Sequence, residues 1–214
     1  MRLTFLLLLF GFAASGQQSE KIIVDNKAKQ FTDSAAKFIM HYWQNNDLKK
    51  AILLLNKAIE IDSNYINAYT LKLSLQMNLK QYNNALKTAL QINRLRPNSP
   101  SSYVTPGILN EKLGNTISSH YYFTTAIKKY DNILDTMSTK NKYYYVHLLN
   151  KAIDLILAGQ QVNGNVILKQ LYNKESNSLN KENIQHYMNK SRKEILDDIF
   201  NPKSTDQIKV TRNN

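Results

Sequence analysis

Cysteine is absent from this 214-residue chain. Disulfide bonds, thiol catalysis and cysteine-ligated metals are therefore excluded, and the fold must be held together by packing alone. Only six glycines are present, and none of them forms the glycine-rich loop that cradles a phosphate. Beyond the first 16 residues, no hydrophobic run approaches the ~20 residues that a membrane-spanning helix needs.

Catalytic patterns are missing as well. The histidines are scattered and stand in no metal-binding arrangement such as His-Glu-x-x-His, at His41, His120, His147 and His186. Asp197 and Asp198 are adjacent, so on a helix they point in different directions and cannot act as a carboxylate pair. The sequence therefore predicts no catalytic residue, no metal and no cofactor, and it favours a protein that is not an enzyme.

Acidic residues are missing from Ser63 to Asn110, in a chain whose formal charge is +12. The same stretch carries the cations of a candidate basic patch, Lys72, Lys80, Lys87, Arg94 and Arg96. These cations could steer an acidic partner to the chain. In the alternative, the arginines complement the carbonyl end of a helix and the lysines are solvated. Nucleic acid is disfavoured, because most cations are lysine and no nucleic-acid-reading motif is present.

A repeat is what the sequence does contain. Asn46–Ala51 lies over Lys80–Ala85 when the chain is moved by 34 residues, and Ala58 then lies over Ile92. Pro97 follows a predicted second helix, where a residue without a backbone donor suits a helix end. A period of this length predicts stacked helical hairpins. Because each hairpin contacts only its neighbours, the pattern favours an extended binding surface over an enclosed catalytic pocket.

A third hairpin follows at the same offset, with Gly107, Gly114, Phe123 and Ala126 at the expected positions. Gly107 is predicted where two helices approach closely, Gly114 at the turn and Ala126 where the next repeat packs. These residues resemble the tetratricopeptide repeat family, over about residues 32–133. The resemblance implies units of a helix, a tight turn and an antiparallel helix.

A fourth hairpin is predicted over Lys142–Lys174, displaced by 11 extra residues. It places Ala152 at the helix crossing, Gly159 at the turn, and Leu168 and Leu171 on the second helix. The extra residues are close to three helical turns and predict an elongated second helix in the third hairpin; a loop around residues 135–141 is the alternative.

The remaining segments complete the predicted organisation. Residues 1–16 have one cation, a short apolar run and small residues, which is typical of a secretory signal peptide. We expect cleavage after Gly16 and export, to the periplasm of a two-membrane bacterium or otherwise outside the cell, with no membrane span in the mature chain. The other predicted segments are a lead-in over 17–31, three repeats over 32–138, a degenerate fourth repeat and a capping helix within 142–200, and a flexible tail over 201–214. The capping helix, Lys181–Phe200, would cover the last apolar surface of the stack; a helix that lies on a membrane surface or on a partner is the alternative.

The family resemblance also implies a binding face along the first helix of each hairpin. The corresponding candidate residues are Lys37, Met40, Trp43, Gln44, Thr70, Ser74, Met77, Asn78, Val104, Ile108, Glu111 and Lys112. The positions at which relatives clamp a terminal carboxylate carry no lysine or asparagine here. The face therefore favours an apolar or mixed segment held by Met40, Trp43 and Met77, unless Trp43 only packs inside its own hairpin.

The predicted fold is an all-α, right-handed solenoid of three to four hairpins with a C-terminal capping helix. The predicted function is a non-enzymatic scaffold that binds a protein or peptide. Two alternatives stay open: an inhibitor or immunity-type protein that blocks one enzyme, and an accessory protein that meets an anionic envelope polymer through its lysines.

Overall fold

The computed structural model describes residues 24–41 and 45–201. Within these residues the chain forms ten α-helices and no strand, which confirms the all-α prediction. The helices fall into two compact units that divide after Asp135, called here the N-terminal unit (α2–α7) and the C-terminal unit (α8–α11). The predicted signal peptide and most of the predicted tail lie outside the described residues.

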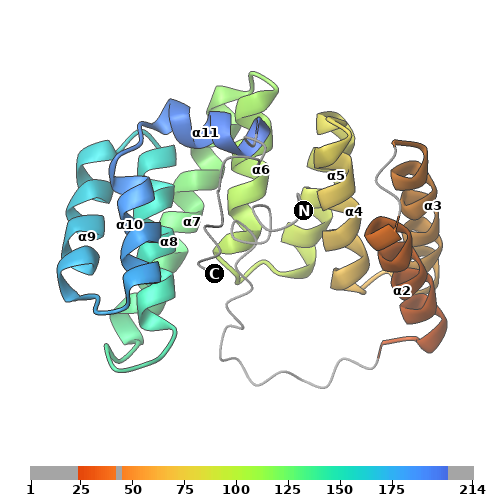
Figure 1. Ribbon diagram of the computed structural model, residues 1–214, viewed down its shortest axis with the longest axis horizontal. Helices are drawn as coiled ribbons and strands as arrows, with labels where there is room; N and C mark the ends of the chain where they lie inside the picture. The colour runs from red at the N-terminus through yellow and green to blue at the C-terminus, as the bar shows by residue number, and fades with distance from the viewer. Residues whose placement is uncertain (1–23, 42–44, 202–214) are drawn as a thin grey trace, which may run out of the picture. The chain divides into compact units, whose positions relative to one another are not determined.

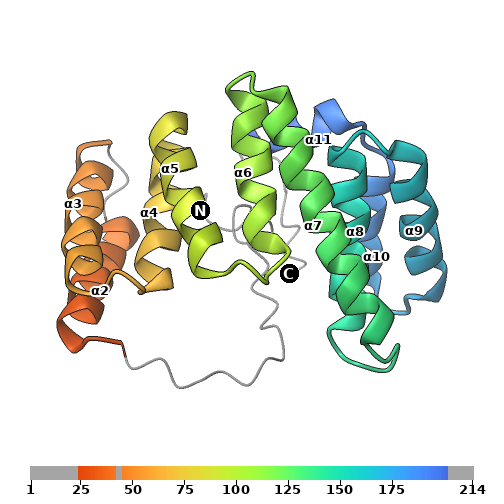
Figure 2. The ribbon, with the colours of Figure 1, turned by 180° about the vertical axis from the view of Figure 1, so that it is seen from behind.

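The N-terminal unit consists of three consecutive helical hairpins, which lie side by side in chain order in Figures 1 and 2. Their helices are α2 (Asn26–His41), α3 (Asn45–Ile61), α4 (Ile66–Asn78), α5 (Tyr82–Leu95), α6 (Ser101–Lys112) and α7 (Thr116–Thr136). Consecutive helices pack through small or apolar residues, among them the fully buried Ala51, Leu55 and Ala58 of α3. The hairpin repeat predicted from the 34-residue period is therefore confirmed.

The first helix begins earlier than the sequence predicted. We placed the start of the repeats at residue 32, whereas α2 begins at Asn26. Asp25 explains the difference, because its side-chain Oδ1 accepts hydrogen bonds from the backbone amides of Lys27 (2.8 Å) and Ala28 (3.2 Å). An aspartate in this position satisfies amides that a helix start leaves unpaired.

The C-terminal unit contains one further hairpin and two shorter helices. They are α8 (Tyr144–Leu157), α9 (Gln161–Lys174), α10 (Ser178–Met188) and α11 (Arg192–Phe200). Figure 1 shows α8, α9 and α10 running side by side, with α11 turned across them. Ala152, Leu168 and Leu171 are buried, as the predicted fourth hairpin requires.

The same turn closes the second, third and fourth hairpins. Lys80, Gly114 and Gly159 occupy it with φ values of 55°, 80° and 86°. In each turn the following amide donates to the carbonyl five residues earlier at 2.8 Å, which is the longer hydrogen bond of a Schellman motif. Gly159 follows Gly114 by 45 residues, which is the 34-residue period plus the 11 extra residues. The fourth hairpin therefore ends its first helix in the same way as its predecessors.

Two helices approach closely at Gly164 in the fourth hairpin. A Cβ atom built on Gly164 of α9 would lie 2.6 Å from the backbone oxygen of Ala152 and 2.6 Å from Cγ1 of Ile156, both on α8. Gly107 makes a comparable approach in the third hairpin, where a Cβ atom would lie 2.8 Å from Cε1 of Phe123. The close approach predicted at Gly107 is confirmed, and Gly164 is a second crossing that we did not predict.

Two predictions about helix lengths change in detail. Helix α7 is elongated to 21 residues, and the connection to α8 occupies what remains of the extra segment. The capping segment is two helices instead of one, because Ser191 starts a new helix. Its Oγ accepts from the amide of Glu194 (3.3 Å), and Glu194 Oε2 accepts from the amide of Ser191 (2.7 Å). This reciprocal capping box begins α11.

The segment around the α10–α11 connection is tied to the fourth hairpin. Gln161 Nε2 donates to the carbonyl of Lys190 (3.1 Å), and Arg192 Nε donates to the carbonyl of Leu157 (2.7 Å). Ile184, Ile195 and Phe200 of α10 and α11 are buried. These contacts hold α10 and α11 against the hairpin formed by α8 and α9.

Candidate functional site

Most residues of the predicted binding face on α4 make their contacts within the protein. The hydroxyls of Thr70 and Ser74 donate to carbonyls one turn earlier in their own helix, at 3.0 Å and 3.2 Å, and both residues are half-buried. Met77 on α4 and Ile108 on α6 are 8% and 3% exposed, so they serve the packing of the hairpins. The side chain of Met77 is therefore not exposed for the predicted contact with a partner.

Three other predicted contacts cannot be placed. Trp43 and Gln44 lie outside the described residues, as does the side chain of Met40. Lys37 on α2 is exposed. At the N-terminal end of the predicted face, Lys37 is therefore the one candidate whose side chain is described.

The exposed part of the predicted face lies near the ends of α4 and α6. Asn78 and Lys112 occupy equivalent positions, 34 residues apart, and both are exposed. The ammonium group of Lys112 lies 5.4 Å from the ring centroid of Tyr82. Val104 and Glu111 on α6 are half-buried. This region offers amide, ammonium and carboxylate groups beside small apolar surfaces.

The five cations of the basic patch differ in exposure. Lys72 lies on α4 and is half-buried, and burial lowers the pKa of its ammonium group. Burial likewise lowers the pKa of Arg96, which follows α5. Lys80, Lys87 and Arg94 are exposed and lie seven residues apart, so Lys87 and Arg94 share one side of α5, with Lys80 at the turn before it.

Lys80 stands in a conformation that favours glycine, because its repeat position is the left-handed turn position. We expect Lys80→Gly to raise the free energy of unfolding by about 0.5–1 kcal/mol, since relief of the left-handed strain exceeds the added chain entropy of glycine. The same substitution at Lys87, inside α5, should lower it by about 1 kcal/mol. Urea denaturation of the two variants measures both effects. If Lys80→Gly lowered the free energy of unfolding, Lys80 would not occupy the left-handed turn position.

The closest group of titratable side chains joins α10 to α11. Lys190 pairs with Asp198, and its Nζ also lies 2.9 Å from Nε2 of His186. Burial and the neighbouring Lys190 lower the pKa of His186. The adjacent Asp197 is exposed. Among the described residues, no group of three His, Asp or Glu side chains is placed to hold a metal ion.

A run of tyrosines on α7 was not among the predicted site residues. Tyr122 lies 5.4 Å from Tyr121 and 6.3 Å from Tyr103 of α6, measured between ring centroids. Lys129 places its ammonium group 5.1 Å from the centroid of Tyr103. The signal in the sequence was the consecutive pair Tyr121-Tyr122, but only the packing of α6 against α7 adds Tyr103 and Lys129 to it.

The match to a known family falls within the first hairpin. Residues 41–65 match the family model described as the tetratricopeptide repeat. Residues 41–65 are identified as a tetratricopeptide repeat. The match covers the end of α2 and the whole of α3, and the repeated turn extends the same hairpin design to the later units.

Two solved structures are similar to this repeat chain. PilW, described as a widely conserved type IV pilus biogenesis factor, aligns with a TM-score of 0.48 and 17% identity over 70% of this chain and 62% of PilW. The MamA protein aligns with a TM-score of 0.48 and 12% identity over 83% of this chain and 97% of MamA. The chain thus spans less than two thirds of the length of PilW, and we transfer no property from either protein. The comparison with curated proteins gives no match.

In the part of the chain that the structure describes, no helix combines the length and the apolar character that crossing a bilayer requires.

Proposed function

We propose that this repeat protein is an exported, non-catalytic scaffold that binds a protein or peptide along the first helices of its hairpins. The observation that carries the proposal is the pair Asn78 and Lys112, two exposed polar side chains at equivalent positions of successive repeats. Equivalent positions of stacked repeats present a regular series of groups to one extended segment. Such a surface suits binding better than chemistry.

The chemistry of this face supports a mixed polar and apolar ligand. The Asn78 amide can both donate to and accept from a peptide backbone, and Lys112 can donate to a carbonyl or a carboxylate. Thr70, Ser74 and Val104, earlier on the same two helices, are half-buried and uncharged. A segment with backbone groups for Asn78 and an acceptor for Lys112 would fit, whereas dense negative charge is not required.

The experiment is affinity capture from the envelope and secreted fractions of the native host, with the full chain as bait. We expect the unchanged chain to retain a partner at moderate salt. The double variant Asn78→Ala/Lys112→Ala should not retain this partner. Lys169→Ala/Asn173→Ala, an exposed lysine and asparagine on α9, provides a control with the same change in composition. Equal loss from both variants, or capture of no partner, would contradict the proposal.

Anionic polymer is the competing outcome, because Lys87 and Arg94 are exposed in a stretch without acidic residues. A polymer-binding surface would lose its ligand steeply as salt rises and on neutralisation of Lys87 and Arg94. The scaffold proposal predicts a small effect of both changes on the captured partner. The salt series run on the same bait separates the two functions.

Export is tested on the protein isolated from the same host. We expect its first residue to be Gln17, as cleavage after Gly16 requires, and we expect it in the periplasmic or secreted fraction. N-terminal sequencing and fractionation measure both. A chain that keeps Met1 and stays in the cytoplasm would contradict the exported location without affecting the binding face.

A further inference from the structure

A cluster of tyrosines and cations lies on α5, α6 and α7, apart from the residues of the proposed binding face. We call Arg94, Tyr103, Tyr121, Tyr122 and Lys129 the tyrosine–cation cluster. The rings of Tyr121, Tyr122 and Tyr103 follow one another at centroid distances of 5.4 Å and 6.3 Å. Lys129 lies at one end of this series, 5.1 Å from the centroid of Tyr103.

Hydrogen bonds hold two members of the cluster, Tyr103 and Arg94. Tyr103 donates from its hydroxyl to the carbonyl of Pro97 at 3.0 Å, which fixes the ring at the start of α6. Arg94 donates to Gln91 Oε1 at 2.9 Å and remains exposed. Burial and the other two tyrosines raise the pKa of Tyr122, whereas Arg94 acts in the opposite direction, which places the guanidinium group within electrostatic reach of that ring.

Neither cation has a carboxylate at ion-pair spacing on its own helix. The positions three and four residues from Arg94 and from Lys129 carry no Asp or Glu. These are the positions at which helical side chains form ion pairs. Neither cation is therefore neutralised by an ion pair at helical spacing.

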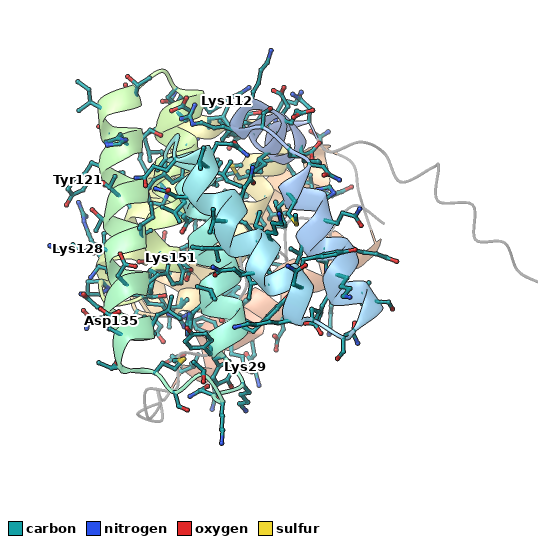
Figure 3. All side chains as sticks on the ribbon, turned by 90° about the vertical axis from the view of Figure 1, so that its left-hand side faces the viewer. Lys29, Lys112, Tyr121, Lys128, Asp135 and Lys151 are labelled. Carbon is teal, nitrogen blue, oxygen red and sulfur yellow. The ribbon has the colours of Figure 1, made fainter. Side chains whose placement is uncertain are left out.

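An apolar surface adjoins the cluster on α7. Tyr121 is 60% exposed, and Ile117, one turn earlier on the same side of the helix, is 87% exposed. Figure 3 shows Tyr121, Lys128 and Asp135 along the outer side of α7. The outer surface of α7 thus changes from apolar at Ile117 and Tyr121 to cationic at Lys128, and Asp135 marks its acidic end.

We propose that the tyrosine–cation cluster is a second docking surface, and that it binds an acidic segment of a protein partner with an apolar side chain next to its carboxylates. The carboxylates would pair with Arg94 and Lys129, and the apolar side chain would cover Ile117 and Tyr121. Tyrosine and arginine are the side chains that contribute most at protein interfaces, because they join a large contact area to directed polar groups. An anionic polymer would use the cations and leave Ile117 exposed.

The first test selects peptide ligands from a random library. Random twelve-residue peptides displayed on phage are panned against the full chain, and the enriched peptides are synthesised for affinity measurement. We expect enrichment of acidic peptides that contain an aliphatic or aromatic residue beside their carboxylates. Peptides without an acidic bias would overturn the proposal.

Variants then locate the bound peptide. We expect Arg94→Ala/Lys129→Ala and, separately, Tyr121→Ala to weaken binding by about tenfold or more. Lys169→Ala/Lys174→Ala removes the same charge from exposed positions of α9 and should change the affinity by less than about twofold. Equal losses from the two double variants would show attraction to net charge alone. Polygalacturonate that competes as well as an apolar-containing peptide would assign the surface to a polymer and overturn the proposal.

This inference stands apart from the proposed function. Asn78→Ala/Lys112→Ala should leave binding of the selected peptides unchanged, because neither residue belongs to the cluster. Loss of peptide binding only in that variant would place the peptides on the face formed by the first helices. The two surfaces can therefore fail or succeed independently.

Discussion

Replacing Gly164 with alanine is expected to lower the free energy of unfolding of the C-terminal unit by about 1–3 kcal/mol. The added methyl group would lie 2.6 Å from the backbone oxygen of Ala152, which is closer than carbon and oxygen can approach. The methyl group would also lie 2.6 Å from Cγ1 of Ile156, so α8 and α9 must separate. Glycine to alanine inside a helix ordinarily stabilises by about 0.5–1 kcal/mol, which makes the sign of the effect informative.

Asn163→Ala is the matched control, because Asn163 precedes Gly164 on α9 and is exposed. It should be neutral or slightly stabilising. Urea denaturation followed by far-ultraviolet circular dichroism suits the measurement, since the only tryptophan, Trp43, precedes this unit in the chain. If Gly164→Ala were as stable as Asn163→Ala, α8 and α9 would not cross closely and the fourth hairpin would differ from the structure described.

Replacing Asp154 with asparagine is expected to stabilise the protein at neutral pH by about 1–3 kcal/mol. Asp154 on α8 is 2% exposed, and its Oδ2 atom has no hydrogen-bond partner in the structure. Burial raises the pKa of this carboxyl group well above its usual value. Asparagine keeps the size of the side chain and removes the charge that would otherwise have to be desolvated or neutralised.

The stabilisation should depend on pH with a definite sign. Between the pKa of an unfolded aspartate, about 3.9, and the raised pKa of Asp154, the folded chain binds a proton that the unfolded chain lacks. The contribution of Asp154 to stability is therefore full below the unfolded pKa and is lost as pH rises through the folded pKa. The advantage of Asp154→Asn should shrink towards zero near pH 3.5 and grow towards neutral pH.

Thermal or urea denaturation of both proteins across this range measures the difference. Asp197→Asn is the control, because Asp197 is an exposed aspartate and should show no comparable trend. An advantage for Asp154→Asn that was constant with pH would mean that the carboxyl group is not buried in the folded chain.

The hairpin plan could be predicted because a repeat places equivalent residues at fixed distances in the chain. Gly114 and Gly159 adopt the left-handed conformation that their turns require, and the 11-residue displacement of the fourth hairpin recurs in the position of its turn. The same offset, applied once more, would also have identified Lys80 as a turn residue. The period determines which residues are equivalent, and the left-handed turn conformation explains why glycine stands at two of these positions.

The binding face was harder to predict, because the period does not determine which side of a helix its neighbours cover. Met77 and Ile108 occupy family binding positions, yet both are buried here. Asp154 could not be recognised as buried, since a lone aspartate in an apolar helix is also compatible with a solvated edge. The break at Ser191 was hidden because apolar residues continue at helical spacing on both sides of it.

We propose that this repeat protein binds a protein partner through shape and directed contacts instead of net charge. The most direct measurement is a calorimetric titration of the captured partner into the full chain at several salt concentrations. We expect a one-to-one complex whose affinity changes by less than about tenfold between low and moderate salt. An affinity that falls steeply with salt, or heat without a defined stoichiometry, would contradict it and favour a charged polymer as the ligand.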